Sequence, residues 1–209
     1  MAQEAVATKR HLASHPTKEG VTVTRVDRRF IDLMISWAGA VVALAMVALG
    51  AAAIYGGSFA LDNVRDRLEP QNVTFPPAEA MSDYDRSEGL TAFAGQKVDT
   101  GTEAEAYSRY IGGHLTDINN GATYSETSTA ARAEGIPEDE AAELQGKVDT
   151  LFKGETLRAI LLNAYGWWTV GQITMWAGIG AVVAGLLLAV FVGLGFFHAR
   201  RARIATEPA

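Results

Sequence analysis

The fold is decided by two stretches of sequence that contain no Asp, Glu, Lys or Arg. The first is LMISWAGAVVALAMVALGAAAIYGGSFAL, residues 33–61, and the second is AILLNAYGWWTVGQITMWAGIGAVVAGLLLAVFVGLGFFHA, residues 159–199. An α-helix rises about 1.5 Å per residue, so about 20 apolar residues cross the roughly 30 Å hydrocarbon core of a bilayer. Both stretches exceed this length. The sequence therefore predicts an all-α membrane protein, with two transmembrane helices and a small α-helical extracytoplasmic domain between them.

The expected organisation has five parts. They are a basic tail without periodicity at 1–29, a transmembrane helix at 30–58, an acidic helical domain at 59–164, a second transmembrane helix at 165–197 and a basic tail at 198–209. The first tail is polar enough that we expect it to be disordered.

The distribution of charge predicts the orientation. Six arginines lie near the inner ends of the two stretches: Arg25, Arg28, Arg29, Arg200, Arg201 and Arg203. Residues 62–158, by contrast, contain nineteen acidic and nine basic side chains. Lys and Arg close to membrane spans are retained in the cytoplasm. We therefore expect both termini to be cytoplasmic and residues 62–158 to lie outside. The high alanine and glycine content fits a bacterium with a GC-rich genome, so the membrane expected is a bacterial plasma membrane.

One alternative concerns the first stretch, which has features of a cleaved signal peptide. Ala51, Ala52 and Ala53 offer a small-residue cleavage site after an apolar run. However, about thirty polar residues precede that run, and it continues beyond the site, so a retained anchor is favoured.

Helical signals cover much of the segment between the stretches. Leu61, Val64 and Leu68 continue the first helix with helical spacing until Pro70 ends it. Thr102–Glu105 has the form of a capping box that starts a helix at residue 103. Further helices are expected at 124–134 and from Pro137 onward into the second stretch. Gly112 and Gly113 require either a close neighbour or a break in their helix.

The two spans are expected to pack on each other through small residues. These are Gly39 and Ala43 in the first span, and Ala177, Ala181, Gly185, Ala189 and Gly193 in the second. We expect Gln172 and Thr174 to hydrogen-bond across to the first span. Tyr165, Trp167 and Trp168 are expected to mark the outer membrane interface, which amphipathic rings prefer.

The sequence offers no catalytic, cofactor-binding or metal-binding set. Without cysteine, thiolate catalysis, iron–sulfur clusters and Cys-rich zinc sites are excluded. Zinc needs three or four convergent ligands, and the four histidines are scattered at His11, His15, His114 and His198. We expect His114 to be a packed or surface residue.

A calcium site is the alternative that the acidic segment leaves open. Residues 83–87 begin like a calcium loop, but Glu88 stands where the loop needs glycine and Ala94 where it needs glutamate. Residues 117–121 fail similarly, with Ser128 at position twelve. Solvated turns are the favoured interpretation of both segments.

Four segments together resemble one protein family. They are AGQKV at 94–98, residues 106–115, GATYS at 121–125 and LFKGETLRAILLNAYGWWTVG at 151–171. The family consists of actinobacterial two-span membrane proteins with an extracytoplasmic loop, often labelled aromatic ring-opening dioxygenases. The resemblance transfers no catalytic residue. Ring opening of the extradiol type uses iron held by two His and a carboxylate, whereas residues 62–158 contain one His.

These observations predict a non-catalytic accessory or scaffold subunit of an envelope or respiratory complex. It would act through its outer domain and its helix faces, with the lipid bilayer and one or more membrane proteins as partners and no nucleic acid. The alternative is an extracytoplasmic module that binds or senses a ligand or a cation such as calcium. No cofactor is expected.

Overall fold

A computed structural model describes residues 28–204, and its secondary structure is entirely helical apart from one isolated β-bridge. Expectations for the two tails, including His11 and His15, fall mainly outside these residues. The helices are α1 (Arg28–Leu68), α2 (Asp83–Ser87), α3 (Gly101–Ile118), α4 (Tyr124–Ala130) and α5 (Glu138–Ile204). Single 3₁₀ turns cover Glu69–Gln71, Ala78–Ala80 and Leu90–Phe93.

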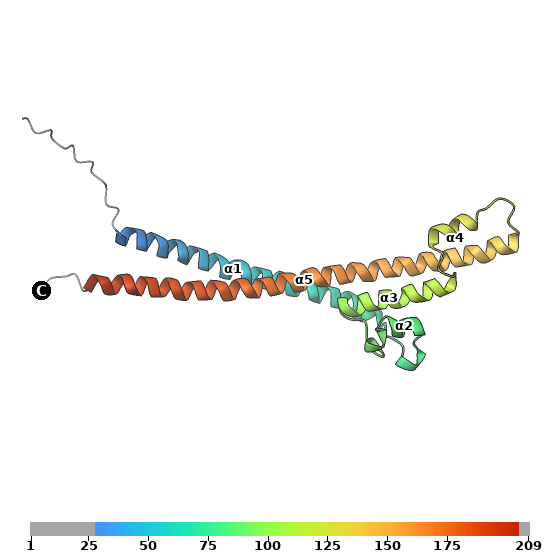
Figure 1. Cartoon of the computed structure of the whole chain (residues 1–209), viewed down its shortest axis with the longest axis horizontal. Helices are drawn as coiled ribbons and strands as arrows, with labels where there is room; N and C mark the ends of the chain where they lie inside the picture. Colours follow the sequence, from blue (N-terminus) through green and yellow to red (C-terminus); the bar gives the residue numbers. More distant parts are fainter. Residues whose placement is uncertain (1–27, 205–209) are drawn as a thin grey trace, which may run out of the picture.

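Two long helices dominate the molecule. α1 has 41 residues and α5 has 67, which correspond to lengths of about 62 and 100 Å. They lie side by side, with the start of α1 and the end of α5 together at one end of the molecule and α2, α3 and α4 towards the other (Figure 1). Both are long and apolar enough to cross a membrane. Only 11% and 6% of their most apolar windows are buried, which is unlike the core helix of a soluble protein.

α1 and α5 pack antiparallel along a seam of small residues. Its buried positions recur every seven residues: Ala43, Gly50, Gly57 and Val64 on α1, and Gly171, Gly178 and Gly185 on α5. A Cβ atom at Gly178 would lie 2.7 Å from the Gly50 carbonyl oxygen. At Gly57 it would lie 2.7 Å from the Gly171 carbonyl oxygen. The two backbones therefore touch, and no side chain fits between them.

The period of the seam corrects the sequence-based expectation. Packing of the two helices on each other is confirmed, and so is the first-span pair, since Ala43 is buried and Gly39 lies against Val192. On α5, however, the series with four-residue spacing is the wrong face. Of its α5 members only Gly185 is buried, and a Cβ at Gly193 would meet nothing within 4 Å. A seven-residue period matches 3.5 residues per turn, which keeps one stripe facing its partner along two coiled helices.

α3 packs on α5 and runs antiparallel to it. Gly101 lies directly against Trp168, because a Cβ at Gly101 would overlap the indole side chain. Further along, Arg158 Nε donates to the Ser108 carbonyl oxygen (3.2 Å). Near the end of α3, Leu115 occupies the space that a side chain at Gly154 would need. These contacts fix α3 on one face of α5.

The other face of α3 covers the loop that follows α1. Phe75 is buried there, with its ring centroid 5.0 Å from that of Tyr107 and 5.5 Å from that of Phe93. The Thr74–Lys97 bridge holds this segment, since Phe75 N donates to the Gln96 carbonyl oxygen (2.9 Å). Leu90, Val98 and Leu68 complete the core.

The structure resolves the question of Gly112 and Gly113 in favour of close neighbours. α3 continues through both residues. The Tyr84 ring lies against Gly113, and a Cβ at Gly112 would lie 3.1 Å from the Arg158 guanidinium carbon.

Several expected boundaries shift by a few residues. The capping box of α3 is formed by Thr100 and Glu103 rather than by Thr102, so the helix begins at Gly101. The helix expected at 124–134 ends at Ala130, where Arg132 folds back on the Ser128 carbonyl oxygen. α5 begins one residue after Pro137.

Substituting a seam glycine should separate the long helices. Gly178→Leu places a side chain against backbone atoms that cannot rotate away, so we expect a destabilisation of about 1–3 kcal/mol or more. Thermal unfolding of the purified protein in detergent measures this as a lower Tm. Gly180→Leu is the matched control, because a Cβ there meets nothing within 4 Å. An equal loss of Tm in both variants would contradict the seam.

The first turn of α4 should titrate with Glu126. Hydrogen bonds from the Thr123 backbone N–H and then from its hydroxyl (both 2.8 Å) lower the pKa of Glu126 below its ordinary value of 4.5. Because the folded form favours the carboxylate, this stabilisation is present above pH 4.5 and is lost as the pH falls through the lowered pKa. NMR titration of the Thr123 amide should show a midpoint below 4.5 that Glu126→Gln removes. A midpoint at or above 4.5 would contradict the cap.

Candidate functional site

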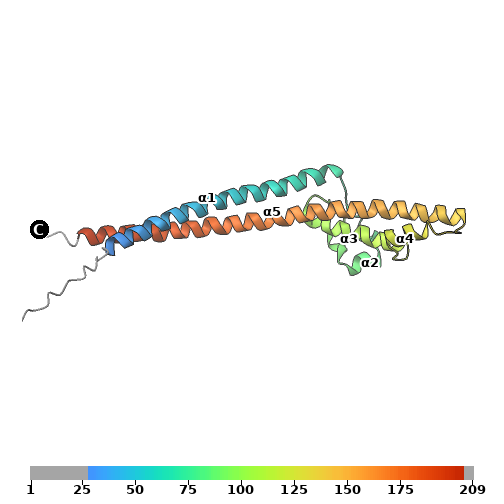
Figure 2. The ribbon, with the colours of Figure 1, turned by 90° about the horizontal axis from the view of Figure 1, so that it is seen from above.

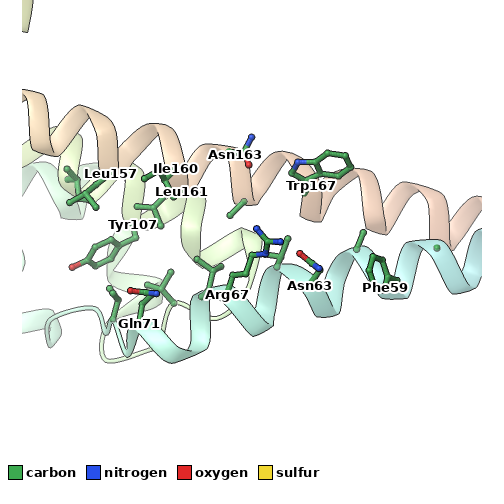
Figure 3. Close-up of a pocket in the computed structure, with 18 residues that line it drawn as sticks. Phe59, Asn63, Arg67, Gln71, Tyr107, Leu157, Ile160, Leu161, Asn163 and Trp167 are labelled. Atoms are coloured by element: carbon green, nitrogen blue, oxygen red, sulfur yellow. The ribbon is translucent and has the colours of Figure 1, made fainter.

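A groove of about 990 Å³ lies where α1, α3 and α5 meet (Figure 3). The long helices diverge towards the end of the molecule that carries α2, α3 and α4 (Figure 2), and α3 closes the space between them at that end. The volume is at the upper end of the range of small-molecule sites.

One edge of the groove is polar and belongs to α1 and the turn after it. Asn63, Arg67 and Gln71 lie four residues apart, and this spacing places them on one side of the helix. Phe59, about one turn before Asn63 in α1, extends the same edge into the uncharged stretch. The groove therefore begins beside the uncharged stretch of α1 and extends past Asp62, the first charge after that stretch.

The opposite wall is apolar and belongs to α5. Leu157, Ile160, Ala164 and Trp167 follow helical spacing and face the groove (Figure 3). Three of them expose more than half of their surface: Leu157 at 53%, Ile160 at 59% and Trp167 at 58%. Asn163 adds an amide to this wall. A ligand here would meet hydrocarbon on one side and polar groups on the other.

Arg67 is the one charged residue among those that line the groove. Its side chain extends between α1 and α5 (Figure 3), and it has no ion pair or side-chain hydrogen bond to any residue that the structure describes. Arg65, two residues earlier, is occupied differently, with its guanidinium 5.8 Å from the centroid of the Trp168 ring. An unpaired cation in a segment rich in acids favours an anionic group in the groove.

Tyr107 contributes a neutral phenol at the end of the groove that lies farther from Phe59 (Figure 3). Burial raises the pKa of Tyr107 above its ordinary value of 10.0. The neighbouring Tyr110 has a raised pKa as well, through burial first and then through Tyr107 and Asp85. Both rings therefore stay protonated near neutral pH, and Tyr107 offers a hydrogen bond rather than a charge.

His114 is held by its own helix. Its Nδ1 lies 3.0 Å from the Tyr110 carbonyl oxygen, and its ring is 4.4 Å from that of Tyr110. Across residues 28–204, no three His, Asp or Glu side chains gather as a metal site would require.

The two segments considered for calcium have different structures. Residues 83–87 form α2, and Asp85 is a buried cap whose Oδ2 accepts from the Ser82 backbone N–H (2.9 Å). A solvated turn is therefore the wrong interpretation of this segment. Residues 117–121 end α3 in a turn, as expected, with Asn120 and Gly121 in the left-handed region (φ 50° and 81°). Asn119 there donates to Thr127 of α4.

Two expectations about α5 are wrong. Trp168 faces α3 rather than the surroundings, because α3 covers it and leaves 8% of it exposed. Tyr165 and Trp167 are the exposed rings of that trio. Gln172 is exposed, and neither it nor Thr174 has a side-chain hydrogen bond to α1 among the described residues.

The groove was missed by sequence reasoning. The four-residue spacing of Asn63, Arg67 and Gln71 was available as a signal. Its apolar wall, however, lies about ninety residues away in the chain. The seam sets the register between the two helices and so decides which residues face each other.

Comparisons with protein-family models, with curated proteins and with solved structures find no match to this chain.

Proposed function

We propose that this chain is a non-catalytic two-span protein of the bacterial plasma membrane, with both termini cytoplasmic. In this proposal it serves as a scaffold or accessory subunit whose outer domain presents a binding surface away from the lipid. The resemblance to actinobacterial two-span proteins and the exposed apolar surface of both long helices support this location.

The level of the charges along the helix pair supports the same placement. Gly57 and Gly171 are opposite each other, so Asp62, the first charge after the uncharged stretch, lies near the level of Trp167. At the other end, the rings of Trp37 and Phe196 are in contact, with their centroids 5.9 Å apart. Arg29 lies eight residues before Trp37, and Arg200 lies four residues after Phe196. The uncharged part of α1 is about 43 Å long, matching the roughly 40–45 Å of a bilayer with its headgroups.

The observation that carries the proposal is the continuation of α5 beyond this level. From Trp167 to Glu138 the helix extends by about 44 Å. Phe152 lies on this extension, about 22 Å beyond Trp167, and is 59% exposed. Its ring is 6.0 Å from that of Tyr124, which is 42% exposed. Lipid cannot cover an aromatic pair at that distance, and exposed aromatic clusters are typical of protein interfaces.

The chemistry of the groove is the reason for proposing a binding role. Its polar members are amides, one arginine and one protonated tyrosine, groups that bind and orient ligands.

Removing the exposed aromatic ring should release the partner. The tagged full-length protein is expressed at native level in its own host, solubilised gently and purified with its partners. We expect a stoichiometric subunit with the wild type and with Lys153→Ala, but not with Phe152→Ser. Lys153 is exposed and points about 100° around the helix from Phe152.

Both variants change surface residues, for which the expected stability effect is within about 0.5 kcal/mol, and circular dichroism verifies this. Recovery of the wild-type protein without any co-purifying subunit would contradict the scaffold proposal. A partner that Phe152→Ser retains would contradict it as well.

The orientation is tested with reporter fusions. A green fluorescent protein fused after residue 209 should fluoresce, whereas alkaline phosphatase at the same place should be inactive, because the arginines retain this end inside. Alkaline phosphatase inserted at Gly135, in the turn before α5, should be active. The opposite pattern would contradict the charge assignment.

A further inference from the structure

We propose that the groove between α1, α3 and α5 binds one phospholipid with an anionic headgroup from the outer leaflet. The phosphate lies beside Arg67, and an acyl chain lies along Ala164 and Trp167 of α5 towards Phe59 of α1. This inference depends on the membrane location proposed above but not on the protein partner.

The position of the groove relative to the uncharged stretch is the first argument. Gly56, Phe59 and Ala60 line the part of the groove within that stretch, while Asn63 and Arg67 lie beyond Asp62, the first charge after it. A molecule that follows the groove passes from apolar to polar surroundings over about 16 Å. A membrane lipid has this order of chain and headgroup.

Charge is the second argument. Residues 62–158 contain nineteen acidic and nine basic side chains, yet the groove is lined by a cation and no acid. Arg67 is unpaired within the described residues, so its donors are free for a ligand. A guanidinium matches the geometry of a phosphate and binds it through paired hydrogen bonds. Asn63, about one turn earlier on α1, lies near it and adds an amide donor (Figure 3).

The exposed wall is the third argument. Ala164 and Trp167 line the part of the groove between the level of Arg67 and the uncharged stretch of α1, and Trp167 is 58% exposed. Water is an unfavourable neighbour for such an exposed apolar surface, at roughly 25 cal/mol per Å². An acyl chain that runs from a phosphate beside Arg67 towards Phe59 removes this surface from water, and such a chain is already present wherever the protein is in a membrane.

Native mass spectrometry of the full-length protein tests the inference. The protein is purified in a mild non-ionic detergent and titrated separately with phosphatidylglycerol and phosphatidylcholine. We expect one retained phosphatidylglycerol per chain and weaker retention of phosphatidylcholine. Arg67→Gln should weaken phosphatidylglycerol binding by about tenfold or more, as expected for loss of hydrogen bonds to a charged group.

Two further variants test the headgroup site. Ile160→Asp places a carboxylate on α5 close to the level of Arg67 and should also weaken retention of an anionic headgroup, although Ile160 is too exposed for the fold to depend on it. Lys97→Gln is the matched control, since it removes an exposed cation of the same domain that does not line the groove. Its binding should equal that of the wild type.

Equal retention of the two lipids, or unchanged binding by Arg67→Gln, would overturn the inference. So would a rise in Tm with inorganic phosphate equal to that with phosphatidylglycerol, because the ligand would then be an ion. If no lipid is retained and Ile160→Asp instead releases the co-purifying subunit, the groove belongs to the protein partner. Retained lipid together with no partner would sink the scaffold proposal alone.

Discussion

The contact of the α1 and α5 backbones along the glycine seam is the constraint on which the rest of the structure depends. Gly50, Gly57, Gly171 and Gly178 allow the two helices to approach until carbonyl oxygens of one lie where side chains of the other would be. Burial every seven residues keeps that stripe facing inward over the whole shared length. Because the approach tolerates no side chain, it also fixes the register, and the register decides which residues stand opposite each other at the outer end.

The helical segment between α1 and α5 depends on the same register. Gly101 of α3 packs on Trp168, only three residues before Gly171, so the contact of α3 with α5 begins beside the glycine seam. Further contacts at Arg158 and Gly154 hold α3 along α5. Phe75 and its aromatic neighbours then fill the space between α3 and the chain that returns from α1. α5 thus packs against α1, α3 and α4, whereas α2 is held through α3.

This arrangement leaves two apolar surfaces exposed, and they suggest complementary roles. The groove combines an unpaired Arg67 with an exposed apolar wall close to the level of Trp167, which suits an amphiphile. The pair of Phe152 and Tyr124 lies farther out on the extension of α5, which suits a protein. A two-span protein with both features would hold a partner at a set distance from the lipid. The bound lipid would fill the place where the long helices diverge.

The sequence by itself determined the all-α class, the two long apolar helices, and the helical continuation through Val64 and Leu68 to Pro70. These follow from local rules, since uncharged length, helical spacing and proline act within a few turns. The tertiary structure alone decided that Gly178 rather than Ala177 faces α1, that Trp168 is buried, and that Arg67 shares a groove with Ile160. Glycine and alanine are frequent on every side of α5, so composition cannot tell which stripe packs. Only the mutual fit of two backbones selects the seven-residue period, and with it the residues that meet in the groove.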